Sequence, residues 1–278
     1  MIDSYENMCI YDMHTHSEHS HDSVCKLSDM AHSAKKHGLC GFAVTDHCDI
    51  EYCDTVDVFE IAKNSATGAR ALGAICGTEI GEGFWHGDIT EKIIKQNNFD
   101  VIIGSVHAVR YKNYTMPYSQ IDFSKMPRDE IGIYISQYFH DMKKMITKCD
   151  FDILAHLTCP LRYISGKYKI LVPLDAYSKQ IDEILKLIIE KNIALEVNTS
   201  NVFPNSAYCE FMPCESIVRR YKELGGYLIT LGSDAHIAEN CANSFESAYK
   251  MLCEVGFENV YYYKNRTAVP CGRKAETI

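Results

Sequence analysis

Several features that would place this chain in other classes of protein are missing from its 278 residues. No apolar run approaches the roughly 20 residues that a membrane-spanning helix needs. Residues 1–6 are polar and offer no apolar core of a signal peptide. Positive charge is not in excess, since the formal net charge is −9, whereas a nucleic-acid footprint is normally basic. We therefore expect a cytoplasmic protein with no membrane partner and no nucleic-acid partner.

The 13 cysteines lack the features of a disulfide framework. Their number is odd, no Cys-x-x-Cys pair occurs, and most stand alone within periodic segments. A complete framework requires an even number of cysteines, and thiols in the cytoplasm are kept reduced. We expect reduced cysteines, many of them buried as small hydrophobic side chains.

Linkers, low-complexity stretches and internal repeats are also missing. The composition, with 46% hydrophobic and 23% charged residues, is that of an ordinary globular protein. The length allows one large α/β barrel or two smaller domains, and a single core of this size is feasible. Because nothing in the sequence marks a boundary, we expect one domain over residues 1–278.

Short apolar segments alternate with amphipathic ones along the chain. The expected strands are 8–13, 41–45, 74–80, 100–106, 151–155, 193–197 and 227–231, with a terminal strand at 259–263. The expected helices are 27–37, 56–72, 90–96, 131–148, 174–191, 214–224 and 243–254. This alternation is typical of parallel βα units. It predicts an α/β fold whose site lies beyond the carboxyl ends of the strands.

Nearly every expected strand is followed by a side chain that commonly binds metal ions. These side chains are His14, His16, His47, Glu79, His107, His156, Asp234 and His236. The strand at 193–197, which ends at Asn198, brings no such ligand, and no strand end brings Lys or Arg. Several divalent ions would satisfy both the charge and the lone pairs of such a cluster. We interpret the pattern as a multi-metal site.

The motifs around these residues resemble those of the PHP (polymerase and histidinol phosphatase) family. The matching segments are Asp-Met-His-Thr-His at 12–16, Thr-Asp-His at 45–47, Gly-Thr-Glu at 77–79, Gly-Ser-Val-His at 104–107, Ala-His at 155–156 and Gly-Ser-Asp-Ala-His at 232–236. Segments 104–107, 197–200 and 256–263 are most similar to the histidinol-phosphatase branch. The resemblance implies a distorted (β/α)7 barrel with a trinuclear metal site at the C-terminal ends of its strands.

The resemblance also implies which side chains hold each ion. The first ion would be held by His14, His16, Glu79 and Asp234, the second by Glu79, His107 and His156, and the third by Asp22, His47 and His236. His19 and His21 remain alternatives to Asp22. We expect two to three divalent ions, and imidazole and carboxylate ligands suit Zn, Mn or Fe alike.

The activity implied by the resemblance is that of a histidinol-phosphate phosphatase. Such an enzyme hydrolyses L-histidinol phosphate, a small phosphomonoester, to L-histidinol and phosphate in histidine biosynthesis, by a metal-bound hydroxide. Asp234 or His236 would handle protons, and Arg162, in a loop after His156, would clamp the phosphate because a guanidinium pairs with it bidentately. Lys167 and Asn198 are further candidates for substrate binding, and Arg110 is a weaker one.

The amine and imidazole of such a substrate would suit acidic or aromatic side chains in the loops. The candidates are Asp49, Glu51 and Tyr52 after His47, and Phe84, Trp85 and His86 after Glu79. Two other functions remain open. One is a PHP-family phosphoesterase for another small phosphomonoester or phosphotyrosine, and the other is a non-catalytic metal-binding module. The oligomeric state is left open by the sequence.

Overall fold

The computed structural model describes residues 8–50, 58–200 and 210–273. Its strands are β1 (Met8–Cys9), β2 (Tyr11–Thr15), β3 (Gly41–Val44), β4 (Ile75–Gly81), β5 (Val101–Ser105), β6 (Ile153–Leu154), β7 (Ala194–Asn198), β8 (Ile229–Gly232), β9 (Val260–Lys264) and β10 (Thr267–Arg273). Its α-helices are α1 (Leu27–Lys36), α2 (Val58–Leu72), α3 (Gly87–Asn97), α4 (Arg128–Lys148), α5 (Ser178–Glu190), α6 (Glu215–Glu223) and α7 (Phe245–Val255). Each expected strand and helix has a counterpart, displaced by a few residues at its ends.

Seven parallel strands form the centre of the molecule, in the order β2-β3-β4-β5-β6-β7-β8. The two outer strands of this sheet approach each other beyond their ends. The His16 amide donates to the Ala235 carbonyl over 2.9 Å, and the Asp234 amide donates to the His14 carbonyl over 2.8 Å. These bonds draw β2 towards β8 and nearly close a barrel. The predicted (β/α)7 barrel is therefore confirmed.

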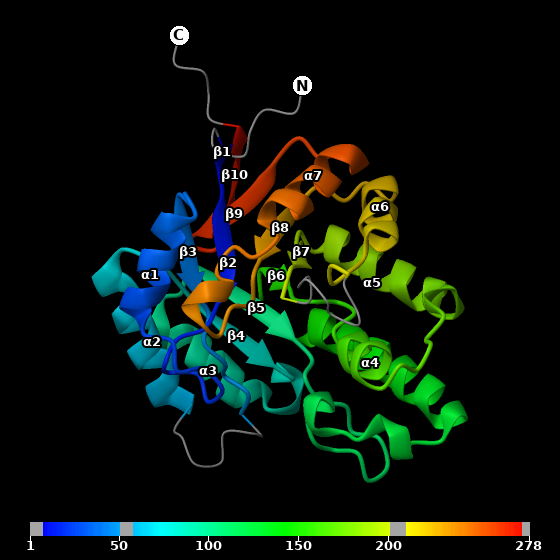
Figure 1. Cartoon of the computed structure of the whole chain (residues 1–278). Helices are drawn as coiled ribbons and strands as arrows, with labels where there is room; N and C mark the ends of the chain where they lie inside the picture. The colour runs from blue at the N-terminus through cyan, green and yellow to red at the C-terminus, as the bar shows by residue number, and fades with distance from the viewer. Residues whose placement is uncertain (1–7, 51–57, 201–209, 274–278) are drawn as a thin grey trace.

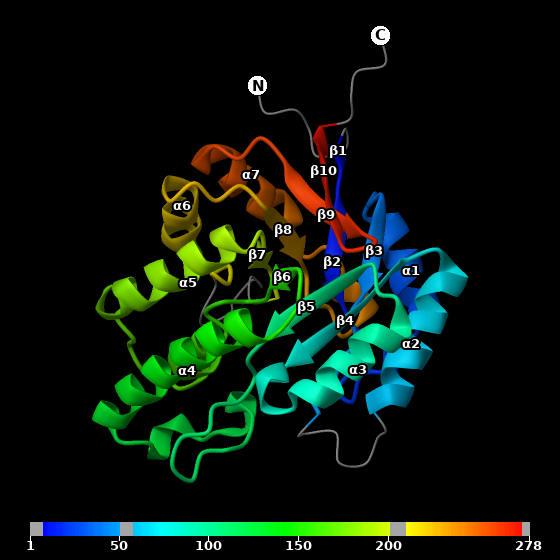
Figure 2. The same ribbon diagram turned by 180° about the vertical axis from the view of Figure 1, so that it is seen from behind.

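The helices surround the strands on the outside (Figures 1 and 2). α1, α2 and α3 lie beside β3 and β4, while α4 and α5 cover the strands from β5 to β7 (Figures 1 and 2). The layer between strands and helices is the large hydrophobic core, which includes Phe42, Ile102 and Leu195. A second, smaller cluster contains Met13 and Ile103 and fills the barrel interior. Both strand faces are buried, as a parallel sheet covered by helices requires.

A small antiparallel sheet, in the order β1-β10-β9, lies at one end of the molecule (Figure 1). From β9, Tyr263 joins the cluster inside the barrel, and its hydroxyl donates to the Asp152 carbonyl over 3.1 Å. The Tyr262 ring stacks on Tyr11 of β2, with ring centroids 4.0 Å apart. This sheet therefore covers the end of the barrel at which the parallel strands begin, and leaves the opposite end for a site.

Three local expectations need correction. Cys9 and Cys40 form a disulfide, so the expectation that every cysteine is reduced is wrong for this pair. Eight other described cysteines, Cys25, Cys76, Cys149, Cys159, Cys214, Cys241, Cys253 and Cys271, are free, and Cys53 and Cys209 lie outside the described residues. β10 was not expected at all. Arg162, expected in a loop, begins a π-helical segment (Arg162–Lys167).

Within the described ranges, no helix is long and apolar enough to cross a membrane.

Candidate metal centre

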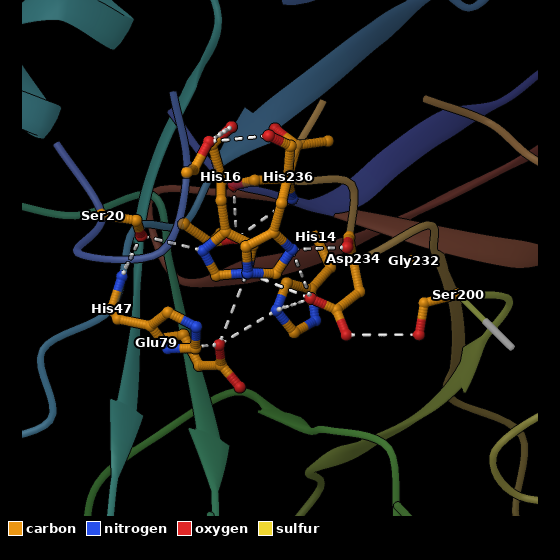
Figure 3. A network of polar contacts seen from close by, with 12 residues as sticks. His14, His16, Ser20, His47, Glu79, Ser200, Gly232, Asp234 and His236 are labelled. Carbon is orange, nitrogen blue, oxygen red and sulfur yellow. Dashed lines mark hydrogen bonds and ion pairs between the residues drawn. The ribbon is translucent and has the colours of Figure 1, made fainter. Parts of the chain in front are cut away.

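The strand order brings the expected ligands to one end of the barrel. His14 lies in β2 and Glu79 in β4, and the other ligands follow the ends of β2, β3, β5, β6 and β8. Because parallel strands end at the same edge, side chains far apart in sequence converge there. Figure 3 shows His14, His16, His47, Glu79, Asp234 and His236 pointing towards one another.

Glu79 lies at the centre of this group, fully buried. Its Oε1 is 3.0 Å from His156 Nε2 and 3.1 Å from His107 Nε2. Its Oε2 lies 3.0 Å from His47 Nδ1, 3.2 Å from His14 Nε2 and 3.6 Å from His16 Nε2. One carboxylate therefore contacts imidazoles on both sides. This is the arrangement expected of a side chain that bridges two ions.

Two aspartates complete the group. Asp234 Oδ1 lies 3.2 Å from His16 Nε2 and 3.6 Å from His236 Nδ1. Asp22 Oδ2 lies 3.1 Å from His236 Nε2 and 3.5 Å from His47 Nε2. These contacts favour Asp22 over the two neighbouring histidines as the ligand beside His47 and His236.

The alternatives to Asp22 lie farther from that point. The His21 ring centroid is 5.3 Å from that of His47. His19 lies beside Gly68 of α2 instead. His16 also stacks on both His47 and His236, with centroids 4.3 and 4.1 Å apart, so the first and third proposed ion positions adjoin each other.

Three of the six rings at this centre are held by the nitrogen that faces away from it. His14 Nδ1 bonds to Glu196 Oε1 over 2.7 Å, and His16 Nδ1 to the Ser20 hydroxyl over 3.1 Å. In the same way, the Nδ1 of His107 bonds to Asp49 Oδ2 over 3.0 Å. A hydrogen bond at one ring nitrogen orients the ring and selects which nitrogen is free to bind a metal. In all three rings, Nε2 is directed towards the centre.

The donor set fits divalent metal ions. The Nε2 atoms of His107 and His156 face each other over 3.4 Å. Two further buried nitrogens, His16 Nε2 and His47 Nδ1, make no hydrogen bond of acceptable geometry in the described part of the chain, although carboxylate oxygens lie 3.2 and 3.0 Å away. Buried polar atoms are normally satisfied, and neutral imidazole and carboxylate are ligands of Zn, Mn and Fe. The grouped ligand atoms lie within 4.8 Å of one another, close enough to hold divalent ions.

Two of the expected ligands have a strained backbone. His156 has φ of 25° and Asp234 has φ of 52°, both in the left-handed region. Residues other than glycine pay about 1–3 kcal/mol for such a conformation, and such outliers cluster at functional sites. The strain persists here because each backbone amide is bonded, that of His156 to Glu196 Oε2 over 2.8 Å and that of Asp234 to the His14 carbonyl over 2.8 Å.

Opposite charges control the pKa values in this cluster. Burial alone would lower the pKa of His14, but Glu196, Glu79 and Asp234 outweigh it and raise that pKa well above its usual value. Burial would raise the pKa of Glu79, yet the surrounding imidazoles hold it well below its usual range. His16 differs because burial and the neighbouring His236 and His47 lower its pKa to about 3. Glu79 is thus anionic and His16 neutral at pH 7, the forms in which both bind metal, while a metal ion would have to displace the proton that the carboxylates favour on His14.

A cavity of about 180 Å³ opens onto this centre. Among the expected side chains, His21, Asp22, His47, Asp49, His107, His156, Arg162, Asp234 and His236 line it, together with Tyr118, Gln120, Cys159 and Tyr163. Arg162 Nη1 donates to the Ser200 hydroxyl over 3.3 Å. The guanidinium therefore shares one cavity with the metal-binding side chains.

Other expected substrate contacts lie elsewhere. Lys167 is exposed, with its ammonium 5.2 Å from the centre of the Tyr168 ring, and Asn198 is fully buried behind Asp234. Neither lines the cavity, so the structure gives no support to them as substrate contacts. Arg110 lies over the Trp85 ring at 4.1 Å. Of the described residues that line the cavity, none is Phe84, Trp85 or His86; Glu51 and Tyr52 lie outside the described residues.

Two buried glutamates were missed by the sequence reasoning. Glu196 lies in the middle of β7, the strand that was expected to contribute no ligand type, and it contacts His14 and His156. Glu82 follows β4 and accepts hydrogen bonds from the backbone amides of His107 and Ala108. A charged residue inside a buried strand is rare unless it is paired. That anomaly in the segment Ala-Leu-Glu-Val-Asn was the available signal for Glu196.

The fold and the site together define a metal-binding α/β barrel of the kind that carries phosphoesterases. The family model described as the PHP domain matches residues 12–200, which is more than half of the chain. The chain belongs to the PHP domain family. The family resemblance inferred from the motifs is thereby confirmed.

Several named proteins are similar to this chain over most of its length. A protein of Clostridium acetobutylicum named "Probable histidinol-phosphatase" is 29% identical over 259 residues, which cover 92% of this chain and 97% of that protein. A protein of Thermotoga maritima with the same name is 28% identical and covers 89% of this chain and 93% of its own length.

A solved structure has the same fold. It is that of histidinol phosphate phosphatase from Lactococcus lactis, complexed with zinc, L-histidinol and phosphate. The TM-score is 0.77 at 22% identity, and the match covers 94% of this chain and 98% of that chain. The likeness extends over the whole barrel.

Proposed function

We propose that this protein is a metal-dependent phosphomonoester hydrolase that converts L-histidinol phosphate to L-histidinol and phosphate. The observation that carries the proposal is the position of Glu79. Its two carboxylate oxygens contact five imidazoles at the mouth of a cavity that also contains Arg162. The names of the relatives that match nearly the whole chain support the choice of substrate.

The contacts support the ion positions that the family resemblance implied. The first ion would lie between His14, His16, Glu79 and Asp234, the second between Glu79, His107 and His156, and the third between Asp22, His47 and His236. Divalent ions in such a cluster neutralise phosphoryl oxygens and lower the pKa of a bound water. The choice among Zn, Mn and Fe and the number of ions, two or three, belong to this proposal.

The other side chains of the cavity have separate tasks. Arg162 would pair with phosphoryl oxygens of a bound substrate, because its guanidinium offers two parallel N–H donors. Asp234 and His236 both line the cavity, and they are the proposed groups for moving protons at the attacking water or the leaving oxygen. His236 is the more accessible, with 30% of its side chain exposed against 10% for Asp234.

The organic part of the substrate needs a partly aromatic, partly acidic wall. Tyr118 and Tyr163 both line the cavity, as a tilted pair with ring centroids 5.5 Å apart. Their faces suit an imidazole ring, since aromatic rings pack favourably at such distances. Asp49, also in the lining, offers negative charge to the substrate ammonium. The lining therefore offers candidate partners for both ends of L-histidinol phosphate.

Steady-state kinetics on a panel of phosphomonoesters tests this function. The panel contains L-histidinol phosphate, phosphotyrosine, a sugar phosphate, a nucleoside monophosphate and an aryl phosphate, with metal content measured on the same sample. We expect L-histidinol phosphate to give the highest kcat/KM. A higher value for another member would assign the chain to a different substrate within the family. No phosphate release from any member by metal-loaded protein would favour a non-catalytic metal-binding module.

A further inference from the structure

Glu196 is a fully buried carboxylate that the proposed reaction does not itself use. It comes from β7, the strand that contributes none of the proposed metal ligands. We propose that Glu196 is a positioning residue that fixes the tautomer of His14 and the backbone of His156, and so sets the affinity for the first and second ions. This inference rests on the proposed metal site and extends it to a residue outside the ligand set.

Three hydrogen-bond donors converge on Glu196. Its Oε1 accepts from His14 Nδ1 over 2.7 Å, and its Oε2 accepts from the His156 amide over 2.8 Å and from Asn198 Nδ2 over 3.1 Å. An ionised carboxylate is an acceptor at both oxygens, whereas an amide or a protonated carboxyl has a donor at one of them. An ionised carboxylate can accept from all three groups, and this makes Nδ1 the protonated nitrogen of His14.

The bond to His14 decides which nitrogen of that ring carries the proton. With Nδ1–H donating to Glu196, the lone pair of Nε2 is directed at Glu79 Oε2 and Asp234 Oδ1, which lie 3.2 and 3.7 Å away. An ion between these three atoms would find a ligand there. If Nδ1 lost its acceptor, the proton could move to Nε2 and block that position.

The second contact acts on the backbone. His156 has φ of 25°, a conformation that persists only when its surroundings hold it. Glu196 Oε2 holds the amide of His156, and His156 Nε2 in turn lies 3.0 Å from Glu79 Oε1. One carboxylate thus supports ligands of two different ions.

Gly232 in β8 leaves the space that Glu196 needs. A Cβ at that position would lie 2.1 Å from Glu196 Oε1 and 2.7 Å from His14 Cβ. No side chain fits there without displacing the contact between them. The glycine of the Gly-Ser-Asp-Ala-His segment is thereby explained by a packing requirement of the Glu196–His14 pair.

Metal affinity of Glu196→Gln tests the proposal, because the substitution keeps the shape and replaces one acceptor with a donor. Metal-depleted protein is titrated with zinc in competition with a chromophoric chelator, and circular dichroism checks the fold. We expect the affinity of the tighter sites to fall by about 10–100-fold, as for other residues that orient metal ligands. Asp141→Asn is the matched control, since Asp141 is a buried carboxylate on α4 that contacts Gln137 and Lys144. The zinc affinity of this variant should equal that of the unmodified protein.

Unchanged zinc affinity in folded Glu196→Gln would overturn the role of Glu196 and leave the proposed function intact. Failure of the unmodified protein to bind zinc would instead contradict the proposed metal site. If Glu196→Gln does not fold, an NMR measurement on the unmodified protein still tests the proposal. In ¹⁵N-labelled, zinc-loaded protein, imidazole ¹H–¹⁵N correlations assigned with a His14→Asn variant should show His14 protonated at Nδ1. Protonation at Nε2 would overturn the proposal.

Discussion

The Nε2 atoms of His107 and His156 lie 3.4 Å apart, and both face Oε1 of Glu79. His107 is held at Nδ1 by Asp49, so its Nε2 is free to act as a ligand. Two imidazole nitrogens and a carboxylate oxygen thus converge in a buried site. Together they offer more lone pairs than there are protons to share among them. A divalent ion among them satisfies all three.

Removal of one of these two rings should abolish most of the activity. His156→Ala deletes a proposed ligand of the second ion, and ions of this kind contribute several kcal/mol to transition-state stabilisation. Since each 1.4 kcal/mol is tenfold in rate, we expect kcat to fall by about 10²–10⁴-fold while the circular dichroism spectrum is retained. His140→Ala, at an exposed position on α4, is the control and should retain full activity. Near-normal turnover by metal-loaded His156→Ala would remove this residue from the site.

Substitutions of Arg162 and of Lys167 should differ sharply in their effect on kcat/KM for L-histidinol phosphate. Arg162 lines the cavity, whereas Lys167 is exposed and does not. Arg162→Lys keeps the charge but loses the bidentate pairing with phosphate, so we expect kcat/KM to fall about 10- to 100-fold, by the loss of one to two charge-assisted bonds. Lys167→Ala should leave kcat/KM within about twofold. Equal effects of the two substitutions on L-histidinol phosphate would contradict the role of Arg162.

Asp152, near the other end of the barrel, should make the folded state sensitive to pH. Burial raises the pKa of this carboxyl to about 6, although Arg266 opposes the shift. A raised pKa means that the folded state keeps a proton which the unfolded state releases between about pH 4 and 6. The stability from this group is therefore complete below about pH 4 and is lost as the pH rises through about 6. The loss amounts to roughly 2–3 kcal/mol at 1.36 kcal/mol per pKa unit.

Denaturant unfolding of the unmodified protein and of Asp152→Asn, from pH 4 to pH 7, checks this effect. Groups at the metal centre contribute equally to both proteins and cancel in the difference between them. We expect that difference in the free energy of unfolding to change by about 2–3 kcal/mol across the range, in favour of the Asn variant at the higher pH. A constant difference would show that Asp152 titrates normally.

The barrel could be predicted from the sequence because its evidence is local. Mainly apolar segments such as 101–106 and 193–197 are bounded by polar residues and alternate with amphipathic helices, so the residues of each element indicate its type. Parallel strands end at one edge, and this rule alone gathers the side chains that follow them. The position of the metal centre and its ligand types follow from these two facts.

The features that the sequence did not predict depend on contacts between residues far apart in the chain. Others depend on proline or glycine residues that usually weaken an element but are tolerated here. Glu196 bonds to His14, 182 residues away, and no local pattern shows which ring a buried glutamate faces. β10 contains Pro270 and Gly272, which weaken a strand pattern, yet it pairs with β9. The chain is helical from Pro160 up to Arg162, since proline is tolerated in the first turn of a helix. The Cys9–Cys40 contact joins segments that only the folded sheet brings together.

The central claim is that the ions bound around Glu79 carry out the hydrolysis of L-histidinol phosphate. The most direct test measures bound metal and phosphate release on one sample, as metal-depleted protein is titrated with zinc or manganese. We expect no turnover without metal, and activity that rises with occupancy and saturates at two to three ions per chain. Turnover by metal-free protein, or full activity at well below two ions per chain, would contradict it.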